Sequence, residues 1–166
     1  YELGLVSIMS GKIAEGMRIV KETLTSANAQ QIANALPEVL GALGIANYSL
    51  DASDFVRFAA SLPNADRRAF IEAAWVLAIN PDPLGRSYEE SRKFLSRLDV
   101  ANLQDEDKLK VELTSAALLA AEGKFLQARE LAERVARTAF GMKKTGIAER
   151  ATKMAAAYAA SKFWTP

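Results

Sequence analysis

The sequence contains no cysteine and no histidine. Without cysteine the chain can form neither a disulfide nor a thiolate metal site. Without histidine it lacks the commonest general base, the commonest transition-metal ligand and every catalytic triad or dyad built on an imidazole. These two absences exclude most familiar enzyme mechanisms. We therefore expect no enzyme, and the sequence predicts no catalytic, cofactor-binding or metal-binding residue.

Long apolar runs and strand-like patterns are also missing. No stretch approaches the roughly 18 consecutive apolar residues that a membrane span needs. We therefore expect a soluble protein, either cytoplasmic or periplasmic. The β-branched and aromatic residues are scattered and do not alternate with polar ones, so no strand is predicted. The chain begins at Tyr1 without a methionine or a leader, which predicts a fragment of a longer chain or a processed product.

What is abundant is alanine, the most frequent residue of a 166-residue chain that is half apolar and one quarter charged. Because alanine loses no side-chain entropy in a helix and lets neighbouring backbones approach closely, this composition favours tightly packed helices. Apolar residues at steps of three and four predict helices over residues 1–10, 13–24, 29–35, 66–79, 88–98, 105–122, 125–140 and 147–160. A further short helix is predicted after Pro37, and another is predicted to end near Ser61, with Asp51 and Ser53 as its caps.

Two helix starts carry clear local signals. Ser87 with Glu90 three residues later is typical of a capping box. Asp105, Glu106 and Asp107 form an acidic first turn, which suits the positive end of a helix dipole. These carboxylates, with Glu112, could be considered as ligands for a hard cation. They lack the alternating spacing and central glycine of a calcium loop, so we favour the helix start.

A short motif recurs along the chain. Gly11-Lys12-Ile13, followed by Gly16, has the same spacing as Gly123-Lys124-Phe125 followed by Ala128. A third, partial copy is Ser161-Lys162-Phe163, which lies 38 residues after the second. Glycine permits the turn, the aromatic residue fills the gap between paired helices, and the small residue lets the two helix axes approach. The repeat predicts several similar helix pairs.

This layout resembles the second half of a tetratricopeptide repeat. Residues 75–83, with Arg86 and residues 91–95, are similar to a variant common in bacterial proteins of that family, in which an asparagine-proline loop follows the first helix. Residues 155–160 resemble the alanine-rich first helix of a further repeat. The resemblance covers residue 66 to the end, with residues 1–24 as an outlying pair. The spacing of 38 residues departs from about 34 in the standard repeat, and Ser91 replaces the usual alanine, so a generic stack of helical hairpins explains almost as much.

The resemblance implies an all-α fold, an antiparallel stack of helix pairs wound into a right-handed superhelix. Residues 1–166 would form one helical-repeat domain, with a divergent part at 1–62 and tetratricopeptide-like pairs at 63–166. First helices then line a concave wall suited to an extended peptide or a partner helix. We therefore expect a protein-binding scaffold or adaptor. The candidate contact residues are polar positions on the first helices: Arg67, Lys108, Lys110 and Lys153.

Two other functions stay open. The chain could be the helical platform of a larger enzyme whose catalytic domain lies elsewhere. It could also bind nucleic acid, because residues 121–166 carry nine Lys or Arg and only four Glu. The candidate patch comprises Arg134, Arg137, Lys143, Lys144, Arg150 and Lys153. It has no interleaved aromatic residues, so we favour solvated helix faces.

Four single residues need an interpretation. Glu72 is the acidic position on the most apolar helix, so it could belong to a carboxylate pair of the glycoside-cleaving kind. We favour an ordinary ion pair with Arg68, four residues earlier. Trp75 is expected in the core. Phe163 and Trp164 either pack as a cap or stay exposed as an edge through which the chain could self-associate.

Overall fold

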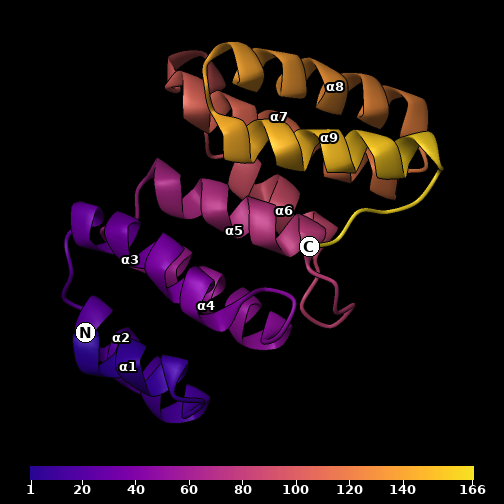
Figure 1. The fold of residues 1–166 in the computed structure, drawn as a ribbon. Coiled ribbons are helices and arrows are strands. Elements are labelled where there is room, and N and C mark those ends of the chain that lie inside the picture. Colours follow the sequence, from indigo (N-terminus) through magenta and orange to yellow (C-terminus); the bar gives the residue numbers. More distant parts are fainter.

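The computed structural model describes residues 1–166 and confirms an all-α fold (Figure 1). It contains nine α-helices, one 3₁₀ turn and no strand. The helices are α1 (Glu2–Met9), α2 (Ile13–Leu24), α3 (Ala29–Leu43), α4 (Ser49–Ser61), α5 (Arg67–Ile79), α6 (Tyr88–Leu95), α7 (Asp105–Ala121), α8 (Phe125–Gly141) and α9 (Thr145–Ala159), with the 3₁₀ turn η1 (Val100–Asn102) before α7.

The helices pack as an open array in chain order. Neighbours in sequence contact one another, from α1 with α2 to α8 with α9. The odd-numbered helices also contact each other in succession, α1 with α3, α3 with α5, α5 with α7 and α7 with α9. The two ends of the chain's helical array, α1 and α9, lie far apart (Figure 1). The odd-numbered helices therefore form one continuous wall, while the right-handed superhelical twist stays a prediction.

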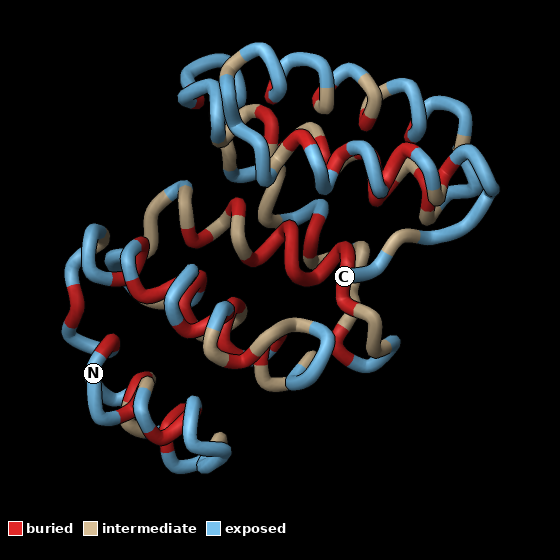
Figure 2. Tube along the Cα trace, in the orientation of Figure 1, coloured by how far each residue is buried: buried red, intermediate tan, exposed pale blue.

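One hydrophobic core runs through the whole array. Figure 2 shows buried residues along the helix sides that face a neighbour, whereas the outer side of α8 is exposed. Alanines account for much of the close packing of α7, α8 and α9, because they let the backbones approach. The fully buried ones are Ala116, Ala120, Ala128, Ala132, Ala139 and Ala151. The small residue predicted after the recurring turn is thus buried at Ala128, as it is at Gly16 in α2.

The same turn ends four helices. In these four turns the residue with a left-handed backbone is Gly11, Gly123, Lys143 or Ser161, at φ of 86°, 76°, 58° and 53° respectively. In each case a lysine follows, and its N–H donates to the carbonyl five residues earlier at 2.8 to 3.0 Å. This is the Schellman closure of a helix. The three copies found in the sequence are confirmed, and the structure adds a fourth at Lys143.

A glycine at the fourth turn should stabilise the protein. Lys143 is exposed and holds a left-handed φ of 58°, a conformation that costs a residue with a Cβ about 1 kcal/mol. We expect Lys143→Gly to raise the free energy of unfolding by about 0.5–1 kcal/mol in urea titrations. Gly123→Ala is the matched control and should lower the free energy of unfolding by a similar amount, because Gly123 holds a left-handed φ of 76° that disfavours a Cβ. The added Cβ would touch nothing within 4 Å, so this backbone cost acts alone. Equal stability of Lys143→Gly and the parent chain would contradict this.

Four predicted helix boundaries were wrong. Residues 29–43 form one helix that includes Pro37, where we expected two. Pro37 is exposed and its helix neighbours Ile32, Leu36 and Val39 are buried, so tertiary packing outweighs the local break. Asp51 and Ser53 lie inside α4, which begins at Ser49.

The remaining two errors concern a helix end and a helix start. α6 ends at Leu95, short of the predicted residue 98. α9 begins at Thr145, two residues before the predicted start, because the turn at Lys143 makes the connection between α8 and α9 shorter than the predicted basic loop. Of the predicted capping box, the Ser87 cap is confirmed, since its hydroxyl accepts from the Glu90 N–H, but the Glu90 carboxylate accepts from Arg57 instead of closing the box. The structure adds a cap at Asp66, whose side chain accepts from the Arg68 N–H. The acidic first turn of α7 is confirmed as well.

A buried polar network fixes the loop between α5 and α6 to α4. The Asn80 amide donates to the Ser49 carbonyl at 2.7 Å and to the Ser53 hydroxyl at 2.6 Å, and its oxygen accepts from the Asp82 N–H at 2.8 Å. Ser53 donates in turn to the Gly85 carbonyl at 2.7 Å. Asn80 and Ser53 are both fully buried. The network is fully satisfied, so the asparagine-proline loop has a structural role here.

Candidate functional site

Four odd-numbered helices line one hollow of the molecule. Residues from α3, α5, α7 and α9 surround a cavity of about 450 Å³. A second cavity of about 290 Å³ continues it along α3 and shares five of its residues. The shared residues are Pro37, Glu72, Trp75, Lys110 and Arg150. We call the combined hollow the groove.

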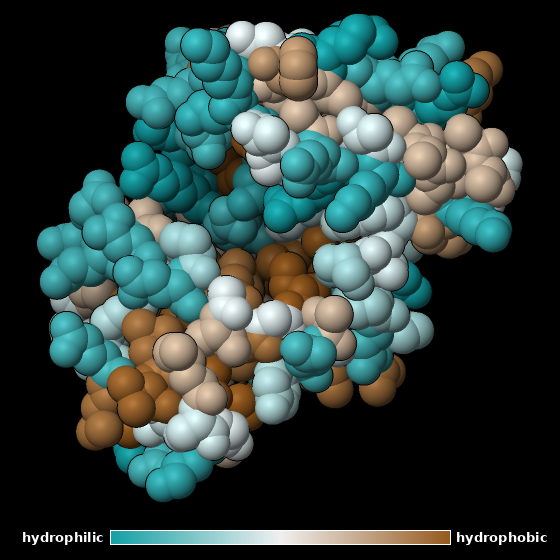
Figure 3. Space-filling view, in the orientation of Figure 1, coloured by the Kyte–Doolittle hydropathy of each residue, from teal (hydrophilic) through white to brown (hydrophobic).

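The groove has an apolar floor and a polar rim. Figure 3 shows apolar surface in the hollow at the middle of the molecule, with hydrophilic surface around much of it. Trp75 and Ile71 from α5 and Leu113 from α7 supply apolar lining, while Arg68 and Gln104 supply polar lining. A concave site with an apolar surface and a few polar groups is the usual form of a binding site.

The carboxylates of the groove are already paired. Glu72 forms an ion pair with Lys110. Asp107 accepts from Arg67 at 3.3 Å, and Glu106 accepts from Lys144 at 2.7 Å. None of the three is available as a free carboxylate in this arrangement. The interpretation of Glu72 as the partner of Arg68 is wrong, because the side chain from the neighbouring helix α7 takes that place.

Two arginines of the groove have no acidic partner. Arg68 on α5 and Arg150 on α9 line the first cavity, and neither lies within 4.0 Å of a carboxylate. The guanidinium of Arg150 lies 5.4 Å from the Trp75 ring centroid, a cation–π contact. The lining carries three basic and three acidic side chains, so its charges balance overall. The positive charge that no carboxylate pairs is confined to Arg68 and Arg150, which favours a ligand with a single negative group at that place.

Trp75 is buried, as predicted, with 4% of its surface exposed. It belongs to the hydrophobic core and also lines the groove, and two groups lie against its ring. Trp164 lies with its ring centroid 6.1 Å from that of Trp75, at an interplanar angle of 32°. Arg150 is the second group. The aromatic surface of Trp75 is thus covered by groups that belong to other parts of the chain.

Pro37 places an unusual backbone group in the groove. Proline has no N–H, so the carbonyl of Ala33, four residues earlier, lacks the donor that a regular helix would supply. Ala33 and Pro37 both line the first cavity. The break in the helical hydrogen-bond ladder at Pro37 therefore lies on the α3 side of the groove.

The four predicted contact residues are not brought together. Lys110 lines the groove, where it is paired with Glu72. Arg67 lies next to the groove through its ion pair with Asp107. Lys108 and Lys153 line neither of the two cavities of the groove. Whether any of the four binds a partner stays a prediction.

Sequence reasoning missed three residues as parts of the groove: Arg68, Trp75 and Arg150. All three were noticed, but were interpreted as an ion-pair partner, a core residue and part of a basic patch. Arg68 and Trp75 lie on α5 and Arg150 lies on α9, two helix pairs further along the chain, so no pattern within a single helix could show that they share a hollow. The signal that could have grouped them is that all three lie on helices predicted to be the first of a pair, and first helices line the concave wall.

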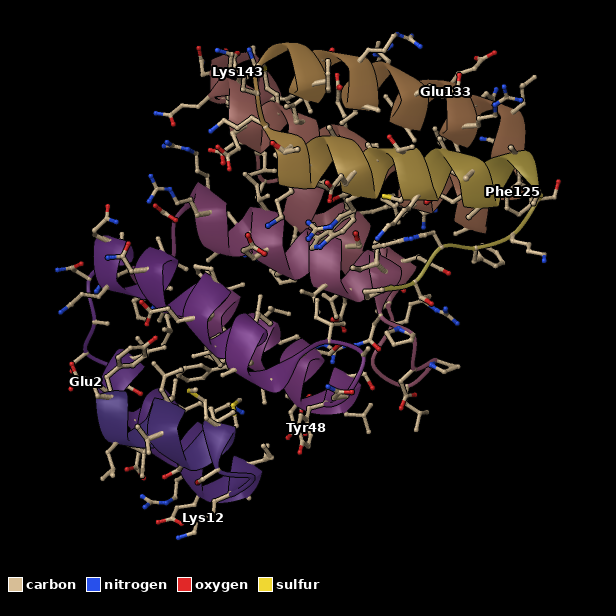
Figure 4. The ribbon with its side chains drawn as sticks, in the orientation of Figure 1. Glu2, Lys12, Tyr48, Phe125, Glu133 and Lys143 are labelled. Atoms are coloured by element: carbon tan, nitrogen blue, oxygen red, sulfur yellow. The ribbon has the colours of Figure 1, made fainter.

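The basic residues predicted to form one patch on the last two helices have different surroundings. Arg134 lies 3.6 Å from Glu112, and Lys144 is paired with Glu106. Arg150 turns into the groove, while Arg137 lines a separate shallow hollow between α8 and α9. On the outer side of α8, Glu133 projects away from the groove (Figure 4) and pairs with Arg129 at 2.7 Å.

A second hollow lies at the first helices. A cavity of about 480 Å³ is lined by Tyr1 and by residues of the α2–α3 junction. The Tyr1 hydroxyl donates to Glu38 at 2.7 Å. Burial, followed by this hydrogen bond, raises the pKa of Tyr1 above its usual range. Because its one carboxylate is already bonded, this cavity has less capacity for a charged ligand than the groove.

Neither a metal site nor a membrane-spanning helix is found in the structure. No group of three or more acidic side chains has the arrangement of a metal site. None of the nine helices combines the length and hydropathy that a membrane span requires. Comparison with protein-family models, curated proteins and solved structures found no match to this chain. The resemblance to tetratricopeptide repeats therefore stays a prediction.

Proposed function

We propose that this protein is a non-catalytic scaffold or adaptor that binds a segment of another protein in the groove. The observation that supports it is the wall of odd-numbered helices α3, α5, α7 and α9, which surrounds a hollow with an apolar floor and two unpaired arginines. A wall of helices that repeats along a stack is suited to holding a linear ligand.

The chemistry of the groove favours binding over catalysis. Its carboxylates are held in ion pairs, and no histidine or cysteine is available to transfer protons or attack a substrate. The charged groups of the lining that no ion pair engages are the guanidinium groups of Arg68 and Arg150, which lie near the Trp75 ring that Trp164 and Arg150 cover. Aromatic and arginine side chains are enriched among the residues that contribute most to protein–protein binding energy.

Site-specific photo-crosslinking tests this proposal. Gln104 lines the groove and is exposed, whereas Gln127 is exposed on α8 and lines none of the larger hollows. We would replace each by p-benzoylphenylalanine in the full chain and irradiate cells that contain it. The Gln104 position should crosslink to a discrete protein, identified by mass spectrometry, and the Gln127 position should not. Equal crosslinking at both positions, or none at Gln104, would contradict a groove-binding function.

A further inference from the structure

The segment Phe163–Pro166 covers part of the groove. In Figure 1 it leaves the end of α9 and returns across the molecule towards α5. Trp164 lies against Trp75, and Pro166 lines the second cavity beside Lys110 and Arg150. The segment therefore lies at the edge of the groove, with Pro166 in its lining and Trp164 packed on the ring of a lining residue.

This segment is held weakly. Residues 163–166 take part in no backbone or side-chain hydrogen bond, so aromatic contacts are their main attachment. Phe163 makes an edge contact with Phe125, with ring centroids 5.7 Å apart, yet 54% of its surface is exposed. Phe125 lies at the end of the molecule where the segment leaves α9 (Figure 4). Such a segment can leave the groove without breaking a hydrogen bond.

The segment also leaves the polar groups of the groove unused. It contains Phe, Trp, Thr and Pro and no acidic side chain, so it cannot neutralise Arg68 or Arg150. A ligand that supplied the aromatic side chain together with a carboxylate would satisfy the groove better than the segment does.

We infer that the groove takes an extended peptide with an aromatic residue close to an acidic one, and that this peptide displaces Phe163–Pro166. The aromatic side chain replaces Trp164 on Trp75, and the carboxylate binds the guanidinium groups of Arg68 and Arg150. The inference rests on the proposed function and names the chemistry of its ligand. The segment acts as an internal competitor that lowers the apparent affinity of the groove.

A protein ligand fits these charges better than a nucleic acid. Three carboxylates, Glu72, Glu106 and Asp107, line the same groove as the two unpaired arginines. A continuous phosphate backbone would lie against them and be repelled. A peptide can place one carboxylate at the arginines and neutral groups elsewhere. The ligand is therefore a peptide with an isolated acidic side chain.

Peptide binding measured by fluorescence anisotropy tests this inference. The probes are three fluorescein-labelled, amidated hexapeptides in which aspartate stands one, two or three residues after tryptophan, in a glycine-rich background. Each has two matched controls, with asparagine for the aspartate and with alanine for the tryptophan. The proteins are the full chain, Trp164→Ala, Arg150→Gln, and Lys153→Gln as a control on the same helix that lines no part of the groove. Circular dichroism checks that each variant is folded.

At least one acidic peptide should bind, and Trp164→Ala should bind it about tenfold more tightly than the parent chain, because the competing segment has lost its anchor. Arg150→Gln and the asparagine peptide should each weaken binding about tenfold, the loss of one charge-assisted contact. Lys153→Gln should change little. Equal binding of the aspartate and asparagine peptides, no gain in Trp164→Ala, or no binding of any peptide would overturn the inference. Displacement of the peptide by a single-stranded oligonucleotide at similar affinity would also overturn it.

Failure of this inference and failure of the proposed function give different results. A protein that crosslinks at Gln104, while all acidic peptides fail, would leave a groove-binding scaffold whose ligand has another chemistry. The absence of any crosslink at Gln104, with no peptide bound, would remove both.

Discussion

Replacing Asn80 by alanine is expected to lower the free energy of unfolding by about 3 kcal/mol, as measured by urea or thermal denaturation. The Asn80 amide group makes three hydrogen bonds in a fully buried site, two of them to α4. Truncation leaves the Ser49 carbonyl and the Asp82 N–H without their partners. An unsatisfied buried polar group costs about 1–3 kcal/mol, and the space left by the amide adds to this.

Asn102→Ala is the control for this prediction. Asn102 is exposed, and its side chain bonds only to nearby Asp99. We expect its loss to change stability by less than about 0.5 kcal/mol. A similar small change in Asn80→Ala would show that the α5–α6 loop does not depend on the network and would remove the structural account of the asparagine-proline sequence.

Gly16→Ala should destabilise the first helix pair by about 1–3 kcal/mol, the usual cost of overpacking. A Cβ at this position would lie 2.6 Å from the Gly4 carbonyl oxygen and 2.8 Å from the Ile8 backbone nitrogen, both in α1. Because these are backbone atoms, the clash can be relieved only if α1 moves away from α2. Hydrogen exchange should therefore quicken in α1 and α2 more than in α7 to α9.

Gly41→Ala is the matched control, because Gly41 lies in α3 and its Cβ would meet nothing within 4 Å. There the gain in helix propensity should act alone and raise the free energy of unfolding by about 0.5–1 kcal/mol. Opposite signs for the two glycines would support the close crossing of α1 and α2. A neutral or stabilising Gly16→Ala would refute it.

In the proposed function, binding depends on the fit of helices rather than on reactive groups. Trp75 provides the flat apolar surface, and Arg68 and Arg150 provide charge from two different helices. The segment that contains Trp164 occupies the aromatic part only. Binding a partner would then exchange one aromatic contact for another, and the carboxylate of the partner would decide the affinity.

Individual helices were predictable wherever the sequence carried a periodic apolar stripe with clear ends. Residues 13–24 form α2 as predicted, because their buried side chains recur at steps of three and four and the turn at Gly11 precedes them. Prediction failed at Pro37, where the break expected from local chemistry is overcome by the burial of neighbouring side chains. It also failed at Lys143, because that turn has neither glycine at the left-handed position nor an aromatic residue two positions later, whereas Phe163 marked the turn at Ser161.

The sequence by itself determined that the chain is helical, that three similar turns divide it, and that it lacks the residue types of the common catalytic mechanisms. These properties depend on side-chain identity and on spacing within a single helix, which the sequence contains directly. Only the tertiary structure decided that Glu72 pairs with Lys110 rather than Arg68, and that Arg68, Trp75, Arg150 and Trp164 surround one groove. The reason is physical: which residues meet across helices depends on the angles and offsets at which neighbouring helices pack, and these arise from the summed fit of many buried side chains.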